Sequence, residues 1–214
     1  MLESDLGSDE TLLNAWRGGD RDAGATLFER YYLSIARFFA NKVGIDCDDL
    51  IQATFLGCLE AIERFRGEAS FRTLIFAIAR NKLLKHLRER NRSQQHFSPL
   101  ESSIEALMPS AAELMLVRRE DQLLLAGLRR LPVDTQILLE LHYWESLPLR
   151  DIALIFDVSP GAIKVRIHRG RQHLAAELEK VSDSARAITT SMHALERWAA
   201  SLKREIDRHG GAVS

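Results

Sequence analysis

Cysteine and long apolar runs are both scarce in this sequence of 214 residues, and each scarcity excludes a class of protein. The two cysteines, Cys47 and Cys58, have no CxxC pairing and no histidine cluster nearby. We therefore expect reduced structural thiols rather than a disulfide framework or a zinc site. The apolar runs, such as Leu74 to Ala79, are far shorter than the roughly 20 residues that cross a bilayer. The N-terminal segment is acidic, the wrong charge for a secretory or transit peptide, so we expect a cytoplasmic protein without membrane insertion.

Catalytic and metal-binding signatures are also missing. The seven histidines are scattered and form no HExxH or zinc-like spacing, and no Walker loop or GxSxG motif is present. His142 lies beside Tyr143 among apolar neighbours, which favours a packed side chain. We expect no catalytic residues, no metal and no cofactor, and we predict that the protein is not an enzyme.

The net charge of −1 gives no hint of a nucleic-acid binder, but the basic residues are concentrated in two segments. Residues 80–92 contain six Lys or Arg and the single acid Glu89, and residues 160–173 contain four Lys or Arg and no acid. Two basic helices on a neutral chain predict two separate contacts with a polyanion. The alternative is a pair of solvated helix faces, which charge alone does not exclude.

Helical periodicity dominates the sequence, and no stretch alternates with a period of two. One amphipathic helix contains Leu27 and ends near Gly44, and a second opens at Asp46. Ser70 is a candidate N-cap for a third helix over 71–90. The polar, Ser-rich segment that follows, with two prolines, predicts a linker. Further helices are predicted over 113–130, after Pro132, over 149–156 and after Ser159.

The last two predicted helices, separated by a three-residue turn, are typical of a helix-turn-helix. On the second helix, four apolar residues recur at core-facing steps: Ile163, Ile167, Leu174 and Leu178. A separate stripe contains Lys164, His168 and Arg171, with Val165, Arg169 and Gln172 beside it. Such a surface could enter a major groove and touch phosphates and base edges. An ordinary helical hairpin with an exposed basic face is the alternative.

These segments resemble the extracytoplasmic-function sigma factors of the sigma-70 family. Asp49 to Gln52, Phe65 to Thr73 and Ile78 to Asn81 resemble domain two, and 131–171 resembles domain four. The resemblance implies an all-α protein with two small helical domains, a flexible linker and a C-terminal helix. The implied bounds are 1–92 for domain two, 93–112 for the linker, 113–181 for domain four and 182–214 for a C-terminal extension.

The resemblance also implies roles for individual residues. Core RNA polymerase would bind Asp49, Gln52 and Phe55. The melted −10 strand would bind Arg66, Phe71 and Arg72. The adjoining duplex would bind Arg80, Asn81, Lys82, Lys85 and Arg88. The −35 major groove would receive Lys164, Val165, His168, Arg169 and Arg171. Ala53 and Leu74 depart from the family pattern, which often has an acid and a tryptophan there.

The implied partners are core polymerase, promoter DNA and, as an open question, an anti-sigma factor or other regulator. In the extension, apolar residues from Ala185 to Ile206 recur at steps of three and four, like a short coiled-coil seam. This helix could pack on the protein's own domains, act as a docking or autoinhibitory helix for a regulator, or continue the helix before it. Two other functions remain open on the residues: a stand-alone helix-turn-helix regulator and an adaptor that binds only proteins.

Overall fold

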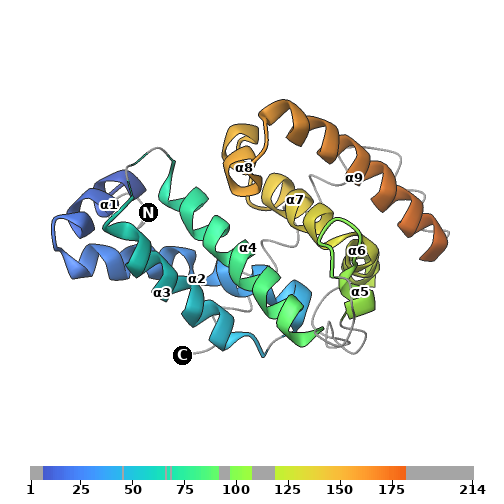
Figure 1. Ribbon diagram of the computed structural model, residues 1–214, viewed down its shortest axis with the longest axis horizontal. Helices are drawn as coiled ribbons and strands as arrows, with labels where there is room; N and C mark the ends of the chain where they lie inside the picture. The colour runs from blue at the N-terminus through green and yellow to red at the C-terminus, as the bar shows by residue number, and fades with distance from the viewer. Residues whose placement is uncertain are drawn as a thin grey trace.

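The computed structural model describes residues 7–44, 46–65, 67, 69–91, 97–107 and 119–181. Within these ranges the chain is helical, with one isolated bridge between Ser103 and Pro132 and no strand. The helices form two groups, α1 to α4 and α5 to α9, and α4 lies along the boundary between them (Figure 1). The prediction of an all-α protein with two helical domains is confirmed.

The first group contains α1 (Asp9–Arg17), α2 (Arg21–Val43), α3 (Asp48–Ile62) and α4 (Phe71–Arg90). The sequence analysis did not predict α1, although Ser8 caps it and Asp9 and Glu10 lie in its first turn. As predicted, α2 is followed by Gly44, and the Ser70 side chain caps α4 by accepting a hydrogen bond from the Thr73 N–H at 3.1 Å. The predicted start of α3 at Asp46 is wrong. Cys47 is the N-cap, because its carbonyl accepts the first helical bonds from residues 50 and 51.

An aromatic cluster joins α1 and α2 to the start of α4. Trp16 makes edge-to-face contacts with Phe28 and Phe71, at ring-centroid distances of 5.2 and 6.0 Å, and Tyr31 meets Phe71 at 5.6 Å. Gly24 permits this packing, since a Cβ there would lie 2.8 Å from the Trp16 ring. The cluster therefore fixes the position of the first turn of α4.

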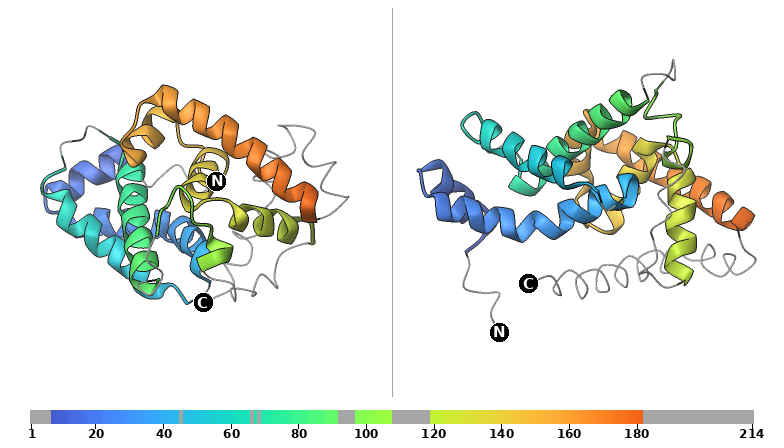
Figure 2. Two further views of the ribbon diagram at one scale, coloured as in Figure 1. Left: turned by 45° about the vertical axis from the view of Figure 1, so that its right-hand side comes forward. Right: turned by 90° about the horizontal axis from the view of Figure 1, so that it is seen from below.

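The second group contains α5 (Ile104–Leu107), α6 (Arg119–Arg130), α7 (Val133–Tyr143), α8 (Leu149–Phe156) and α9 (Pro160–Val181). The long helix α9 packs on α6, α7 and α8, as the two views of Figure 2 show. All four of its predicted core residues are buried. At Gly170, α9 approaches α7 closely, because a Cβ there would lie 2.9 Å from Thr135 Cγ2.

The predicted linker contains α5, which its polar composition did not reveal. Two backbone hydrogen bonds attach the segment to the start of α7, from Val133 N–H to the Ser102 carbonyl at 2.9 Å and from Asp134 N–H to the Pro99 carbonyl at 3.0 Å. Ile104 is fully buried. The predictions for the C-terminal extension, residues 182–214, lie outside the described residues. No described helix is both long enough and apolar enough to cross a membrane.

Candidate nucleic-acid interface

Helices α8 and α9 have the geometry of a helix-turn-helix. α8 ends at Phe156, and the next residue, Asp157, is its C-cap, with a left-handed backbone at φ of 52°, a conformation that Asp tolerates better than most residues. Ser159 then caps α9, and its hydroxyl accepts a hydrogen bond from the Ala162 N–H at 3.2 Å. The turn therefore reverses the chain in a few residues and leaves the first turns of α9 open to solvent.

The outer face of α9 carries most of the predicted groove-reading residues. Lys164, His168 and Arg169 are exposed, and Val165 is 50% exposed. An exposed valine between cations suits apolar contact with a thymine methyl group. Arg171 differs, because it is half-buried and its Nε atom makes no hydrogen bond within the described residues. It therefore lies beside the reading face rather than on it.

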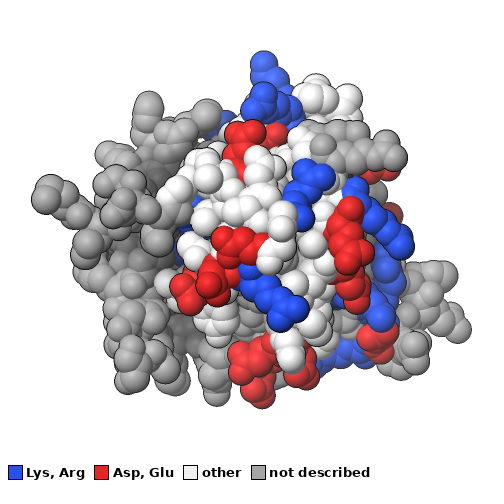
Figure 3. All heavy atoms as spheres, turned by 90° about the vertical axis from the view of Figure 1, so that its left-hand side faces the viewer, with Lys and Arg blue, Asp and Glu red and all other residues white. Residues whose placement is uncertain are grey.

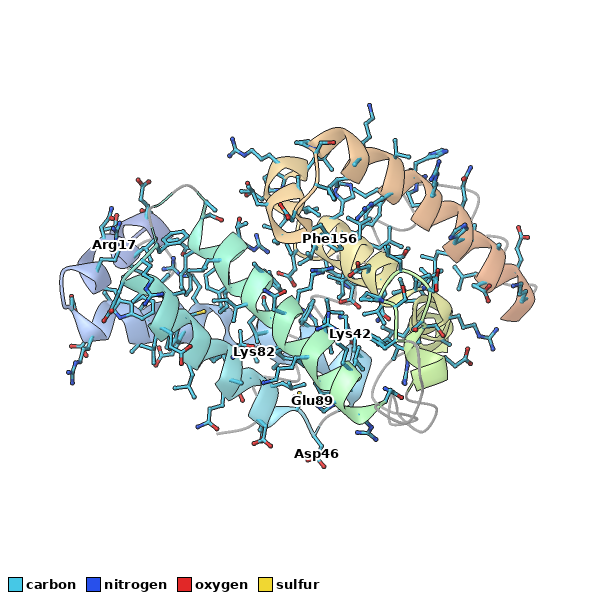
Figure 4. The ribbon with its side chains drawn as sticks, in the orientation of Figure 1. Arg17, Lys42, Asp46, Lys82, Glu89 and Phe156 are labelled. Carbon is cyan, nitrogen blue, oxygen red and sulfur yellow. The ribbon has the colours of Figure 1, made fainter. Side chains whose placement is uncertain are left out.

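The C-terminal half of α4 carries the second basic surface. Asn81, Lys85 and Arg88 are exposed, and Lys85 lies 3.9 Å from Glu89, too far for a strong ion pair. Lys82 is half-buried because its aliphatic chain covers Gly57 of α3. Figure 4 labels Lys82 and Glu89 along this half of the helix. These residues can meet phosphates without any change in the fold.

The N-terminal half of α4 differs from the sequence prediction. Phe71 was predicted to bind the melted −10 strand, but it is only 1% exposed and lies in the aromatic cluster. An apolar residue just after the N-cap turns inward here because α1 covers that side of the helix. Arg72 and Arg80, which were also predicted to bind DNA, are both ion-paired with acids of the second group. Arg66 lies outside the described residues.

The predicted polymerase contacts lie on α3, away from the second group. Asp49 and Gln52 are exposed, and Phe55 is half-buried with its ring stacked on Tyr32 at a centroid distance of 6.4 Å. Leu56 and Leu59 extend the same outer face and are exposed. The end of the molecule seen in Figure 3 mixes acidic and basic residues with uncharged ones. Such a mixed surface suits a protein partner better than a polyanion.

Comparison with known proteins matches both halves of the chain, in order. The family model for Sigma-70 region 2 matches residues 25–93, and the model for Sigma-70 region 4 matches residues 121–174. This chain belongs to the sigma-70 family. More narrowly, it is an extracytoplasmic-function sigma factor. As such, it serves promoter-specific initiation of transcription by RNA polymerase.

Individual relatives agree with this family assignment. The sigma factor is 26% identical over 181 residues to the ECF RNA polymerase sigma-E factor of Haemophilus influenzae, covering 80% of this chain and 96% of that one. It is 26% identical over 179 residues to the sigma-E factor of Escherichia coli K12, covering 77% and 91%. The match to region 2 also disfavours a stand-alone helix-turn-helix regulator, which would leave α1 to α4 unexplained.

Two solved structures share the fold. CnrH, in complex with the cytosolic domain of CnrY, superimposes with a TM-score of 0.57 at 24% identity, covering 81% of this chain and 99% of that one. The sigma factor RpoE of Bartonella quintana, in complex with the anti-sigma factor NepR, has a TM-score of 0.55 at 23% identity, covering 75% and 97%.

The sequence analysis missed a set of ion pairs between the two domains of the sigma factor. We call this set the interdomain ion-pair cluster. Its cations come from α2 and α4, and its acids come from α7 and the residues just after it: Arg37, Lys42, Arg72, Arg80, Asp134, Glu140 and Glu145. One signal was available. Lys42 continues the apolar stripe of Ile35 and Phe38 on α2, and a charge on a buried stripe needs a partner.

Lys42 lies at the deepest point of this cluster. It is 0% exposed, forms an ion pair with Glu140, and donates a hydrogen bond to the Phe38 carbonyl at 2.8 Å. Gln136 donates to the other Glu140 oxygen at 3.1 Å. Burial lowers the pKa of Lys42, and the nearby Glu140 carboxylate opposes that shift. In Figure 4 the labelled Lys42 lies where α2 meets the second domain.

Proposed function

We propose that the two basic helices of this sigma factor divide promoter recognition between them, α9 at the −35 element and α4 at the −10 element. The observation that carries this proposal is the presence of two exposed basic surfaces on two domains that match regions 2 and 4 in order. The domain bounds given above, 1–92 and 113–181, belong to the same proposal.

At the −35 element, Lys164 and Arg169 donate hydrogen bonds to base edges or phosphates in the major groove. Val165 and His168 lie between them on the same exposed face of α9. The contacts of the helix with α6, α7 and α8 hold this face rigidly, which favours sequence-specific reading. Arg171, being half-buried, contributes to phosphate binding at most.

At the −10 element, α4 makes two kinds of contact. Asn81, Lys85 and Arg88 bind the backbone of the duplex next to the melted region, which positions the protein without reading sequence. Lys82 assists from its half-buried position. Arg72 lies at the start of α4, where the unpaired strand would pass, and binds its phosphates. Arg80, in the middle of the helix, binds the phosphates of the adjoining duplex.

Core RNA polymerase binds the outer face of α3. Asp49 and Gln52 supply polar contacts, and Phe55 with Leu56 supplies apolar area beside Tyr32. Most of the affinity for promoters then comes from the complex, because the net charge of the chain is only −1 and its basic surfaces are small.

The remaining parts of the proposal concern place and regulation. The sigma factor acts by binding alone, without catalysis or cofactor, in the cytoplasm where its polymerase works. The two solved neighbours, CnrH and RpoE, are each complexed with another protein, CnrY and the anti-sigma factor NepR. By analogy, we include a regulator of the same kind among its partners.

A run-off transcription assay tests the proposal. The purified chain is mixed with core polymerase and a library of promoter fragments, and transcripts are mapped to their start sites. We expect a subset of fragments to be transcribed, sharing one upstream and one downstream motif. If the isolated chain instead binds a duplex at nanomolar strength and never associates with core polymerase, the proposed division of labour fails.

A further inference from the structure

Helix α1 lies next to the start of α4, and the proposed function gives it no role. Along α4, the proposed contacts pass from the duplex at Arg88 and Lys85 to the unpaired strand at Arg72. Continued past the first turn of α4, this direction leads to α1, because Trp16 of α1 contacts Phe71 with ring centroids 6.0 Å apart. Figure 1 shows the two helices next to each other at this end of domain two. An unpaired strand that runs along α4 therefore meets α1 next.

Two clefts adjoin α1 and share two of its residues. The first, which we call the inner cleft, has a volume of about 820 Å³ and is lined by Asn14 and Arg17 of α1 and by Gly67 and Ser70 of the chain before α4. The second, which we call the outer cleft, has a volume of about 670 Å³ and is lined by the same Asn14 and Arg17 and by residues of α2 and α3. Because both clefts reach Asn14 and Arg17, they form one continuous path from the start of α4 across α1.

The outer cleft has the composition that an unpaired nucleotide requires. Trp16 and Leu59 supply apolar surface against which a base can lie. Arg17 and Arg21 supply positive charge, since both are exposed and neither forms an ion pair in the part of the chain that the structure describes. Glu63 opposes them with one negative charge. The volume of the cleft lies within the range of about 300–1,000 Å³ that is usual for small-molecule sites, and Figure 4 labels Arg17 at this end of the molecule.

The inner cleft contains acids, but they do not block a strand that passes Arg17. Asp9 accepts hydrogen bonds from Arg30 and Tyr31 of α2, so its charge is already paired. Glu10 is exposed at the start of α1, two helical turns or about 10 Å from Arg17. The bonds of Asp9 also fix α1 on α2, which holds the path rigidly before any strand binds.

We propose that α1 extends the binding path of the unpaired promoter strand. Asn14 and Arg17 bind the nucleotides just downstream of the −10 element, and Arg21 and Trp16 hold the next nucleotide in the outer cleft. Because Leu59 also belongs to the outer face of α3, the strand there runs along the edge of the polymerase surface. This inference rests on the proposed function, since it continues a strand that α4 is taken to hold.

The test uses the complex of the full chain with core polymerase and two fluorescein-labelled fork-junction DNAs from a promoter that the complex transcribes. The unpaired strand ends at the last nucleotide of the −10 element in one DNA and a few nucleotides downstream in the other, and affinity is measured by anisotropy. We expect the longer strand to bind about tenfold more tightly, the effect of one stacked base. Core polymerase can contribute to this gain. The variants therefore decide the question.

The double variant Asn14→Ala, Arg17→Ala should lose most of the gain from the longer strand and keep its affinity for the shorter one. Both side chains are exposed, so we expect the fold to be unchanged. Lys85→Ala is the matched control, because it also removes one positive charge from domain two but should weaken both DNAs alike. A double variant that keeps the gain, or that weakens both DNAs alike, would overturn the proposal. Loss of affinity for core polymerase would also overturn it, since the outer cleft would then belong to the polymerase surface.

Glu63→Gln provides a test of opposite sign, which a loss of folding cannot imitate. It removes the negative charge of the outer cleft and should tighten binding of the longer strand by about two- to threefold, with no change for the shorter one. Unchanged binding of the longer strand would overturn the placement of a nucleotide in the outer cleft. Run-off transcription by the unmodified chain reports separately on the proposed function. A complex that starts no transcripts refutes the proposed function, whereas a transcribing complex without these length-dependent effects refutes only the role of α1.

Discussion

The basic helices α4 and α9 look alike in sequence and differ in the folded protein. On α9, Lys164 and Arg169 project into solvent, and no acid pairs with them in the described part of the chain. On α4, Arg72 and Arg80 are each bonded to an acid from the opposite domain. A run of positive charge therefore indicates which helix can meet a polyanion. Whether the helix is available depends on contacts between residues more than 50 positions apart.

The largest expected difference between the two helices is the loss of stability when an apolar residue of each is replaced by alanine. Phe71→Ala on α4 should lower the free energy of unfolding by about 3–5 kcal/mol, because it empties a buried aromatic site. Val165→Ala on the exposed face of α9 should change it by no more than about 0.5 kcal/mol. Urea unfolding followed by circular dichroism measures both. A Phe71→Ala chain of normal stability that had lost only DNA binding would contradict this expectation and support a direct contact of Phe71 with the −10 strand.

The next effect concerns sequence reading by α9. Lys164→Ala or Arg169→Ala should weaken recognition of the −35 element by about 1–3 kcal/mol if a base contact is lost. Lys180→Ala, at the far end of the same helix and paired with Glu177, is the control and should leave promoter preference unchanged. Binding of the polymerase complex to promoter variants measures the effect. A change in −10 preference instead would overturn the assignment of α9.

A smaller effect should appear on the exposed half of α4. Lys85→Ala should weaken binding of the polymerase complex to all promoters alike and reduce the salt dependence by about one phosphate contact. Glu89→Gln removes the acid near Lys85 and should act in the opposite direction. Affinity measured over a range of salt concentrations tests both. Loss of binding at some promoter sequences only would show that Lys85 reads bases.

The smallest effect compares the histidines of the two helices. Burial lowers the pKa of His86 on α4, and Arg90 adds to the shift. The folded state therefore binds fewer protons than the unfolded state, and stability is lost as pH falls from 6.5 through the lowered pKa. His86→Gln should reduce the slope of the free energy of unfolding against pH by less than about 1.4 kcal/mol per pH unit, as measured by urea unfolding at several pH values. His168→Gln, on the exposed face of α9, is the control, and an equally flat slope there would contradict the prediction.

Local chemistry explains what the sequence could predict. Ser70 and Ser159 were assigned as helix caps from their own side chains and the residues just after them, and both cap a helix. The buried stripe of α9 followed from its spacing in the same way. The two domains were assigned because both motifs occur in the family's order.

Long-range packing explains what the sequence could not predict. Phe71 is buried because α1 covers it, and nothing in the residues of α1 indicates that its apolar side packs on the start of α4. The linker segment is attached by backbone carbonyls of Pro99 and Ser102, which leave no trace in residue type. The interdomain ion-pair cluster joins residues far apart along the chain. The sequence around its acids therefore does not indicate that they are paired across the domain boundary.

Gly170 sets how closely α9 packs against α7. Its position directly follows the reading residues, and the missing Cβ lets α9 lie against Thr135 of α7. A single added methyl group would have to lift the helix or displace that threonine. If α9 binds the −35 element as proposed, the depth to which Lys164 and Arg169 reach into the groove is set by Gly170, a residue on the buried side of the helix. Natural or engineered changes in promoter preference can therefore arise on the buried side of the helix, with every DNA-facing side chain left as it is.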